Sequence, residues 1–148
     1  CEELGIPNAT VLEYVEGMAE LMAASDLVIC KPGGLTVTEC LCAKAPMILL
    51  GRAYGQENIN VRMLTSLGAA LHVTTARELV GAMGHVDTNP AIVEAMLTQG
   101  SFLRRPNAAI DIARNALRLA AAEPSTDARM RKKHFLHFYW GHTPAHIR

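Results

Sequence analysis

Short apolar runs separated by helical patterns constrain the fold of this chain more than any other feature. The runs cover residues 27–30, 47–50 and 70–73 and are nearly free of polar side chains. A strand that is apolar on both faces is typical of a parallel sheet covered by helices on both sides. The alternation of such strands with helices predicts an α/β fold built on a Rossmann-like parallel sheet.

Helical spacing of apolar residues predicts helices over residues 18–24, 35–43, 56–67, 90–100 and 108–122. Gly68 ends the third of these, and Asn89 followed by Pro90 begins the fourth. Thr75 with Glu78 forms a capping box, which predicts one more helix after residue 75. The alternating, β-rich segment VLEYV, residues 11–15, predicts an additional strand before all of them.

Composition and charge narrow the class of protein. The 148 residues are 50% hydrophobic and carry no net formal charge, which argues against a nucleic-acid-binding domain. No apolar run approaches the roughly 20 residues of a membrane span. The four cysteines form no C-x-x-C pair, so buried free thiols in a reducing cytosol are expected rather than disulfides or zinc. The chain begins at Cys1, and CEELG resembles the end of a helix, so we expect a fragment of a longer protein.

The predicted sheet indicates where a ligand binds. In an open parallel sheet, ligands lie beyond the carboxyl ends of the strands. That rule selects residues 14–18, 31–36 and 51–60, which we expect on one rim.

The glycine pair Gly33–Gly34 follows the strand at residues 27–30 and precedes a helix. Glycines let the backbone turn sharply and approach a ligand closely, and the helix start offers free N–H groups and partial positive charge. A phosphate or pyrophosphate suits such a site. The alternative is that the two glycines only turn a strand into a helix.

Glu39 lies three residues after Thr36 in the helix that follows the glycine pair. A carboxylate at this point can accept hydrogen bonds from a ribose diol, as the acid of a dinucleotide fold does. It can also serve simply as a favourable charge near a helix N-terminus. The spacing from the glycines to the acid departs from the dinucleotide fingerprint, and no G-x-G-x-x-G is present.

A polar cluster follows the strand at residues 47–50. Gln56, Glu57 and Asn60 fall on the first turn of a predicted helix, with Gln56 and Asn60 on one face. Amides and carboxylates match sugar hydroxyls, which both donate and accept hydrogen bonds. An ordinary polar helix start is the alternative.

Taken in order, the motifs M-x-x-L-M-x-x-x-D, K-P-G-G-x-T-x-x-E and G-Q-E-x-x-N resemble the C-terminal half of a family 28 glycosyltransferase. This inverting GT-B family includes MurG, plant monogalactosyldiacylglycerol synthase and bacterial processive diacylglycerol glucosyltransferases. The resemblance covers residues 11–73 and, more loosely, the helices up to residue 122. The K-P-G-G and G-Q-E forms are closer to the glycerolipid enzymes than to MurG.

The resemblance implies a donor-binding role for each motif. Tyr14 would cover the uracil of a UDP-sugar, the backbone of Val15 would read the base edge, and Met18 would line that pocket. Glu39 would hold the ribose hydroxyls. The diphosphate would meet Gly33, Gly34, Leu35 and Thr36. The sugar would meet Gln56, Glu57 and Asn60.

The family implies inverting transfer of a hexose from a UDP-sugar to a lipid acceptor such as diacylglycerol. It implies no cofactor and no metal, with the UDP-sugar as donor substrate and charge on the leaving group stabilised by backbone N–H groups. The family's donor domain opens with a strand, a glycine-rich loop and a second strand, and we find none of these in this sequence. The acceptor domain and its general base are also missing from it. The catalytic residue is therefore unknown, and we expect the acceptor domain in cis or on a partner chain, with this chain alone inactive and only marginally stable.

Residues 1–122 are accordingly expected to form a partial donor-binding domain. Residues 123–148 form a basic tail of net charge +3, in which four histidines accompany four aromatic residues: His134, His137, His142, His146, Phe135, Phe138, Tyr139 and Trp140. A divergent or disordered terminus, contact with a membrane surface and a metal site are the alternatives for this tail, although no zinc-type spacing is present. The expected location is cytoplasmic or peripheral to a membrane, and the plastid envelope if the source is a plant or alga.

Other functions compatible with these residues are the donor subunit of a split N-acetylglucosaminyltransferase, MurG-like or dolichol-linked, and a non-catalytic nucleotide-binding module. A sugar-nucleotide epimerase shares the GT-B fold and the donor.

Overall fold

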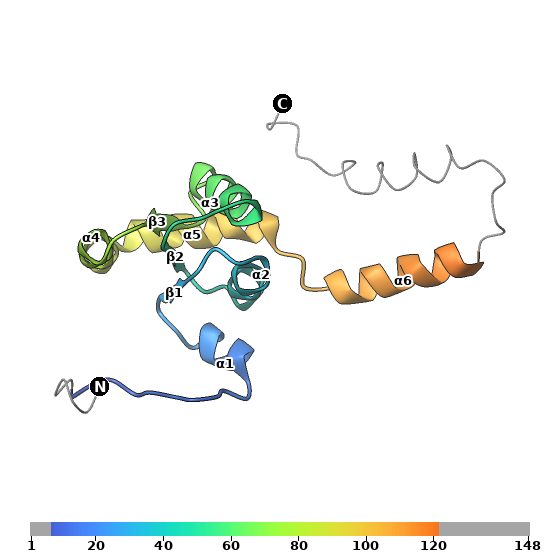
Figure 1. The fold of residues 1–148 in the computed structure, drawn as a ribbon, viewed down its shortest axis with the longest axis horizontal. Coiled ribbons are helices and arrows are strands. Elements are labelled where there is room, and N and C mark those ends of the chain that lie inside the picture. The colour runs from blue at the N-terminus through green and yellow to red at the C-terminus, as the bar shows by residue number, and fades with distance from the viewer. Residues whose placement is uncertain (1–6, 122–148) are drawn as a thin grey trace. The chain divides into compact units, whose positions relative to one another are not determined.

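The computed structural model describes residues 7–121, which divide into two compact units before and after the Pro106–Asn107 bond. The predicted boundary at residue 122 and the histidine-rich tail lie outside this range. No helix in residues 7–121 is long and apolar enough to span a bilayer. The first unit contains α1 (Met18–Ala23), β1 (Val28–Cys30), α2 (Gly34–Ala43), β2 (Met47–Leu50), α3 (Gln56–Ser66), β3 (Leu71–Val73), α4 (Ala76–Thr88) and α5 (Pro90–Leu103), and the second contains α6 (Ala108–Ala121) (Figure 1).

The three strands form one parallel sheet in the order β1-β2-β3. Val28 pairs with Met47, and Ile48 pairs with Leu71. Each crossover contains a helix, as a parallel connection requires. The predicted α/β fold with a Rossmann-like parallel sheet is therefore confirmed.

The central strand β2 divides the core into two layers. Met47 and Leu49 pack into a cluster with residues of α2 and α3, whereas Ile48 packs into a second cluster with residues of α4 and α5. Because successive side chains of a strand point to opposite faces, a fully apolar strand must be covered on both sides. This is why the run at residues 47–50 could be recognised as a buried strand.

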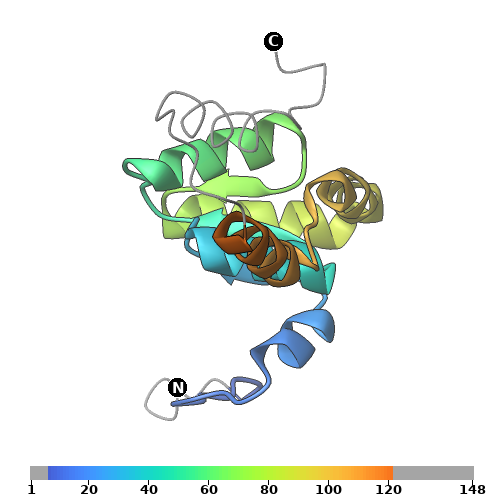
Figure 2. The same cartoon turned by 90° about the vertical axis from the view of Figure 1, so that its right-hand side faces the viewer.

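The prediction of a strand at residues 11–15 is wrong. This segment is irregular, with Val11 71% and Leu12 56% exposed, and it leads away from the sheet in both views (Figures 1 and 2). A strand needs a neighbour to satisfy its backbone groups. Among residues 7–121, β1 pairs with β2 alone, so no strand lies beside the segment.

Helix α5 runs to Leu103 instead of ending near Gly100, as predicted. A Cβ atom on Gly100 would lie 3.1 Å from Leu41 Cδ2. Gly100 therefore allows α5 to pack closely against α2 and does not end the helix. Gly68, by contrast, has a φ of +71° just after α3, as expected of a glycine that ends a helix.

The capping box before α4 is confirmed, with one difference. Thr75 Oγ1 accepts a hydrogen bond from the Glu78 N–H at 3.2 Å, and the Glu78 carboxylate accepts one from the Thr74 N–H at 2.7 Å rather than from Thr75. The Thr74 hydroxyl also lies 3.0 Å from Glu78 Oε2. The Thr74 backbone N–H, followed by its hydroxyl, lowers the pKa of Glu78.

Glu78 should therefore contribute to stability in a pH-dependent way. A carboxyl group whose pKa is lowered in the folded state stabilises the fold above its unfolded pKa, and this contribution is lost as the pH falls from about 5 through the lowered pKa. Glu78→Gln should flatten the decline of the urea midpoint over this acid range. Asp87→Asn, at an exposed position on the same helix, is the control. Equal slopes for wild type and Glu78→Gln would contradict the prediction.

Candidate functional site

Two helices begin at the same edge of the sheet. Strands β1 and β2 are parallel, so their carboxyl ends lie together, and each is followed by a short loop that leads into α2 or α3. Glycine precedes both helices, Gly33 at α2 and Gly55 at α3, and neither helix has a side-chain cap. Both helix starts therefore lie at one rim, although at α3 the Glu57 N–H already donates to the Tyr54 carbonyl at 3.1 Å.

At the start of α2, the first helical hydrogen bond runs from the Val37 N–H to the Gly33 carbonyl at 3.0 Å. The N–H groups of Gly34, Leu35 and Thr36 precede that bond and have no helical acceptor. Three such donors at the positive end of a helix suit an anion.

The glycine pair does not turn in the way that we expected. Gly33 has φ −70° and ψ 141°, which other residues adopt freely, and Gly34 is not among the positive-φ residues. A Cβ atom on either glycine would meet nothing within 4 Å. Neither backbone conformation nor packing within the described chain therefore requires glycine here. What the pair provides is open space directly above the backbone.

Asn60 joins the polar cluster of α3 to this turn. Its side-chain amide donates a hydrogen bond to the Pro32 carbonyl at 2.9 Å. Gln56 is exposed and Glu57 is half-buried on the same first turn. Two of the three predicted segments are therefore brought together, and Asn60 has a structural role whether or not it also contacts a sugar.

The structure does not bring the residues predicted to bind the uracil and ribose into one enclosed site. Glu39 is exposed on α2. Tyr14, 82% exposed, and the half-buried Val15 lie in the irregular segment before α1. Met18 begins α1, which packs against α2, and is 43% exposed.

Sequence reasoning missed the residues that hold the loop after β2. Gly51 has a φ of 101° and Gly55 a φ of 54°, so both ends of the loop adopt conformations that favour glycine. His72 Nε2 on β3 lies 2.8 Å from the Gly51 carbonyl. The spaced glycines were a usable signal, whereas the histidine contact depends on strand pairing.

The described cysteines are free thiols, with Cys40 buried and Cys30 and Cys42 half-buried, so the expected burial holds fully for Cys40 alone. A hydrogen bond between the Cys30 and Cys40 side chains lowers the pKa of Cys30. That same hydrogen bond, followed by burial, raises the pKa of Cys40. Cys30 ends β1, immediately before the turn that carries the glycine pair.

Comparison with known proteins decides the family. The model of the glycosyltransferase family 28 C-terminal domain matches residues 1–96. The chain belongs to glycosyltransferase family 28. It is 41% identical over 73 residues to a processive diacylglycerol beta-glucosyltransferase of Staphylococcus carnosus, covering 49% of this chain and 19% of that protein.

A second group of relatives transfers a different sugar. Over 113 residues, this family 28 chain is 32% identical to the UDP-N-acetylglucosamine--N-acetylmuramyl-(pentapeptide) pyrophosphoryl-undecaprenol N-acetylglucosamine transferase of Azotobacter vinelandii, covering 72% of this chain and 32% of that protein. The crystal structure of Acinetobacter baumannii MurG superposes with a TM-score of 0.60 at 25% identity, covering 70% of this chain and 31% of MurG. The predicted family and the GT-B donor-domain fold are confirmed. The family 28 chain spans less than a third of these relatives, and the roles of its individual site residues stay predictions.

Proposed function

We propose that this chain is the donor-binding part of an inverting hexosyltransferase that transfers a sugar from a UDP-sugar to a lipid acceptor, with diacylglycerol as the first candidate. It supplies the nucleotide-sugar site, and the acceptor site with its general base belongs to a further domain or to a partner chain. Transfer to a lipid would bring the protein to a membrane surface.

The observation that carries this proposal is the unoccupied space above Gly33–Gly34 beside uncapped helix N-termini. A diphosphate fits there because it is anionic and can approach the backbone without meeting a side chain. The N–H groups of Gly34, Leu35 and Thr36 would donate to its oxygens and stabilise the negative charge that develops on UDP as the sugar leaves.

The other residues are assigned around this anion site. Glu39, one turn along α2, would accept hydrogen bonds from the ribose hydroxyls. Gln56 and Glu57, which begin α3 on the same rim, would bind sugar hydroxyls, while Asn60 holds α3 against the turn through Pro32. Tyr14, Val15 and Met18 would contact the uracil once the segment before α1 closes on the nucleotide.

N-acetylglucosamine transfer is the second candidate, and the longer match to the Azotobacter vinelandii enzyme favours it. The two candidates share the UDP site and differ in the sugar. Displacement of bound UDP by UDP-glucose, UDP-galactose and UDP-N-acetylglucosamine would rank the donors.

Calorimetric titration of the chain with UDP tests the site. Wild type should bind UDP, and Glu39→Ala should weaken binding by about 1–3 kcal/mol, because a charged hydrogen-bond acceptor for the ribose is lost. Glu94→Ala, an exposed glutamate near the start of α5, is the matched control and should bind like wild type.

Two results would overturn the assignment. Unchanged affinity in Glu39→Ala would remove the ribose role from that residue. No UDP binding by wild type, with a helical circular dichroism spectrum showing that the chain is folded, would remove the donor-site proposal for this chain on its own.

A further inference from the structure

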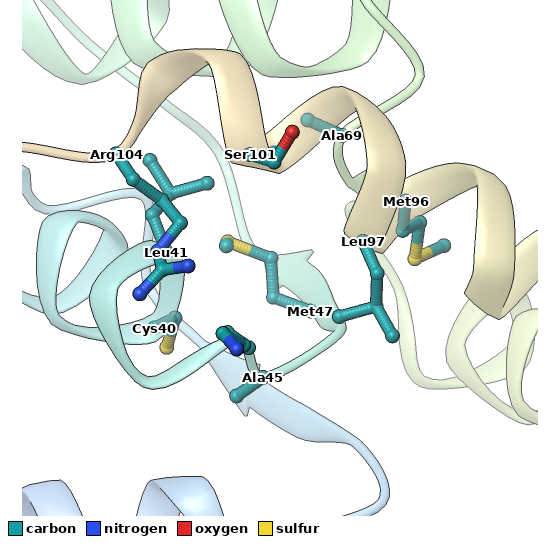
Figure 3. Close-up of a pocket in the computed structure, with 11 residues that line it drawn as sticks. Cys40, Leu41, Ala45, Met47, Ala69, Met96, Leu97, Ser101 and Arg104 are labelled. Carbon is teal, nitrogen blue, oxygen red and sulfur yellow. The ribbon is translucent and has the colours of Figure 1, made fainter.

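A cavity lies at the amino ends of the strands, opposite to the end that carries the proposed donor site. Its volume is about 270 Å³, and it opens between the end of α2, the start of β2 and α5 (Figure 3). Met47 begins β2 and Ala69 shortly precedes β3, so the cavity is near the amino ends of the strands. The lining residues are Cys40, Leu41, Lys44, Ala45, Met47, Ala69, Met96, Leu97, Gly100, Ser101 and Arg104.

The inside of this cavity is apolar. Leu41, Met47, Ala69 and Met96 are all buried, and Figure 3 shows Met47 between Leu41 and Leu97, with its sulfur on the Leu41 side. None of the lining residues is acidic. The cavity therefore suits a small aliphatic group.

Two cationic residues, Lys44 and Arg104, also line the cavity. Arg104 donates through Nη2 to the Cys42 carbonyl at 3.0 Å, but its Nε–H is buried and has no hydrogen-bond partner among residues 7–121. An unpartnered buried donor is unfavourable and calls for an explanation. Lys44 has a φ of 59° because it ends α2: its N–H donates to the Leu41 carbonyl at 3.2 Å, and the Ala45 N–H donates to the Cys40 carbonyl at 2.9 Å. This helix end places Lys44 at the rim of the cavity.

We propose that this cavity binds a short aliphatic carboxylate, with the alkyl chain between Met47, Met96 and Leu97 and the carboxylate at Lys44 and Arg104. The volume of about 270 Å³ accommodates roughly nine groups of the size of a water molecule. This matches a chain of about eight carbons. The end of α2 contributes about half a negative charge, which two cations exceed, so the entrance remains positive.

Methionine methyl NMR can test this proposal on the full chain. Octanoate should shift the ¹³C-methyl signals of Met47 and Met96 saturably, with a dissociation constant of about 1 mM, as expected for so small a ligand. Met63 and Met83, which do not line the cavity, are internal references. Octan-1-ol, which lacks the charge, should bind at least about fivefold more weakly.

Matched variants test whether Lys44 and Arg104 bind the carboxylate. Lys44→Gln and Arg104→Gln should each weaken octanoate binding by about threefold or more. Arg105→Gln should leave it unchanged, because Arg105 donates to the Phe102 and Arg104 carbonyls and does not line the cavity. Ser101→Phe, at an exposed lining position, should block entry while both cations remain.

Several results would overturn the proposal that octanoate binds in this cavity. Absence of saturable shifts at Met47 and Met96, equal shifts at all methionines, or equal affinity for octanol and octanoate would each overturn the proposal. If Arg104→Gln fails to fold, Lys44→Gln and the octanol comparison decide. Saturating UDP should not displace octanoate, so failure of the donor site and failure of this cavity can be told apart.

Discussion

Valine in place of Gly34 is expected to weaken UDP binding by at least about tenfold while the chain remains folded. The Cβ atom of a residue at this position meets nothing within 4 Å in the chain, so the substitution creates no internal clash. Valine in place of glycine also carries no intrinsic penalty in a helix, because glycine is the poorer helix former. The added methyl groups would instead occupy the space assigned to the diphosphate, beside the N–H groups of Leu35 and Thr36.

Calorimetry with UDP measures the effect, and a loss of at least tenfold, about 1.4 kcal/mol, is expected. Gly34→Ala should give an intermediate loss. Gly81→Val is the matched control, because Gly81 is another exposed helical glycine whose Cβ would meet no neighbour. Wild-type affinity in Gly34→Val would show that the open space at the start of α2 is not where the diphosphate binds.

Strand positions in this chain were predictable because a strand buried on both faces appears in the sequence as an uninterrupted apolar run. Strand β2 begins and ends at the predicted residues, and β1 and β3 differ by one residue at their starts. The rim also followed from topology, since parallel strands place their following loops at one edge. For the ligand at that rim, the residues themselves predicted only a chemical class: an anionic group next to a polar group such as a sugar.

Features that depend on distant contacts could not be read from local sequence. The segment at residues 11–15 has the composition of a strand, but pairing decides whether one forms. Gly100 looked like a helix end, yet its role is contact with Leu41, which is distant in sequence. Asn60 looked like part of a polar helix start, and its bond to Pro32 appears only when α2 and α3 are brought side by side.

Leu64→Ala should be strongly destabilising. Leu64 is fully buried on α3, in the cluster that contains Met47 and Leu49. Removing a buried leucine side chain costs about 2–5 kcal/mol, because it loses the burial and leaves a cavity. A domain of this size has a total stability of about 5–15 kcal/mol. Within residues 7–121 one edge of β1 has no paired strand and the segment at residues 11–15 is exposed, so we expect this chain at the low end of that range.

Urea unfolding followed by circular dichroism gives the test. Leu64→Ala should be substantially unfolded without denaturant or should unfold far below the wild-type midpoint. Ile59→Ala, on the same helix but 66% exposed, should change stability by less than about 0.5 kcal/mol. If Leu64→Ala and Ile59→Ala unfold together, the cluster around β2 does not hold the domain. A sharp, highly stable wild-type transition would show that the parallel sheet is stable without a strand on the free edge of β1, against the expectation that the chain alone is only marginally stable.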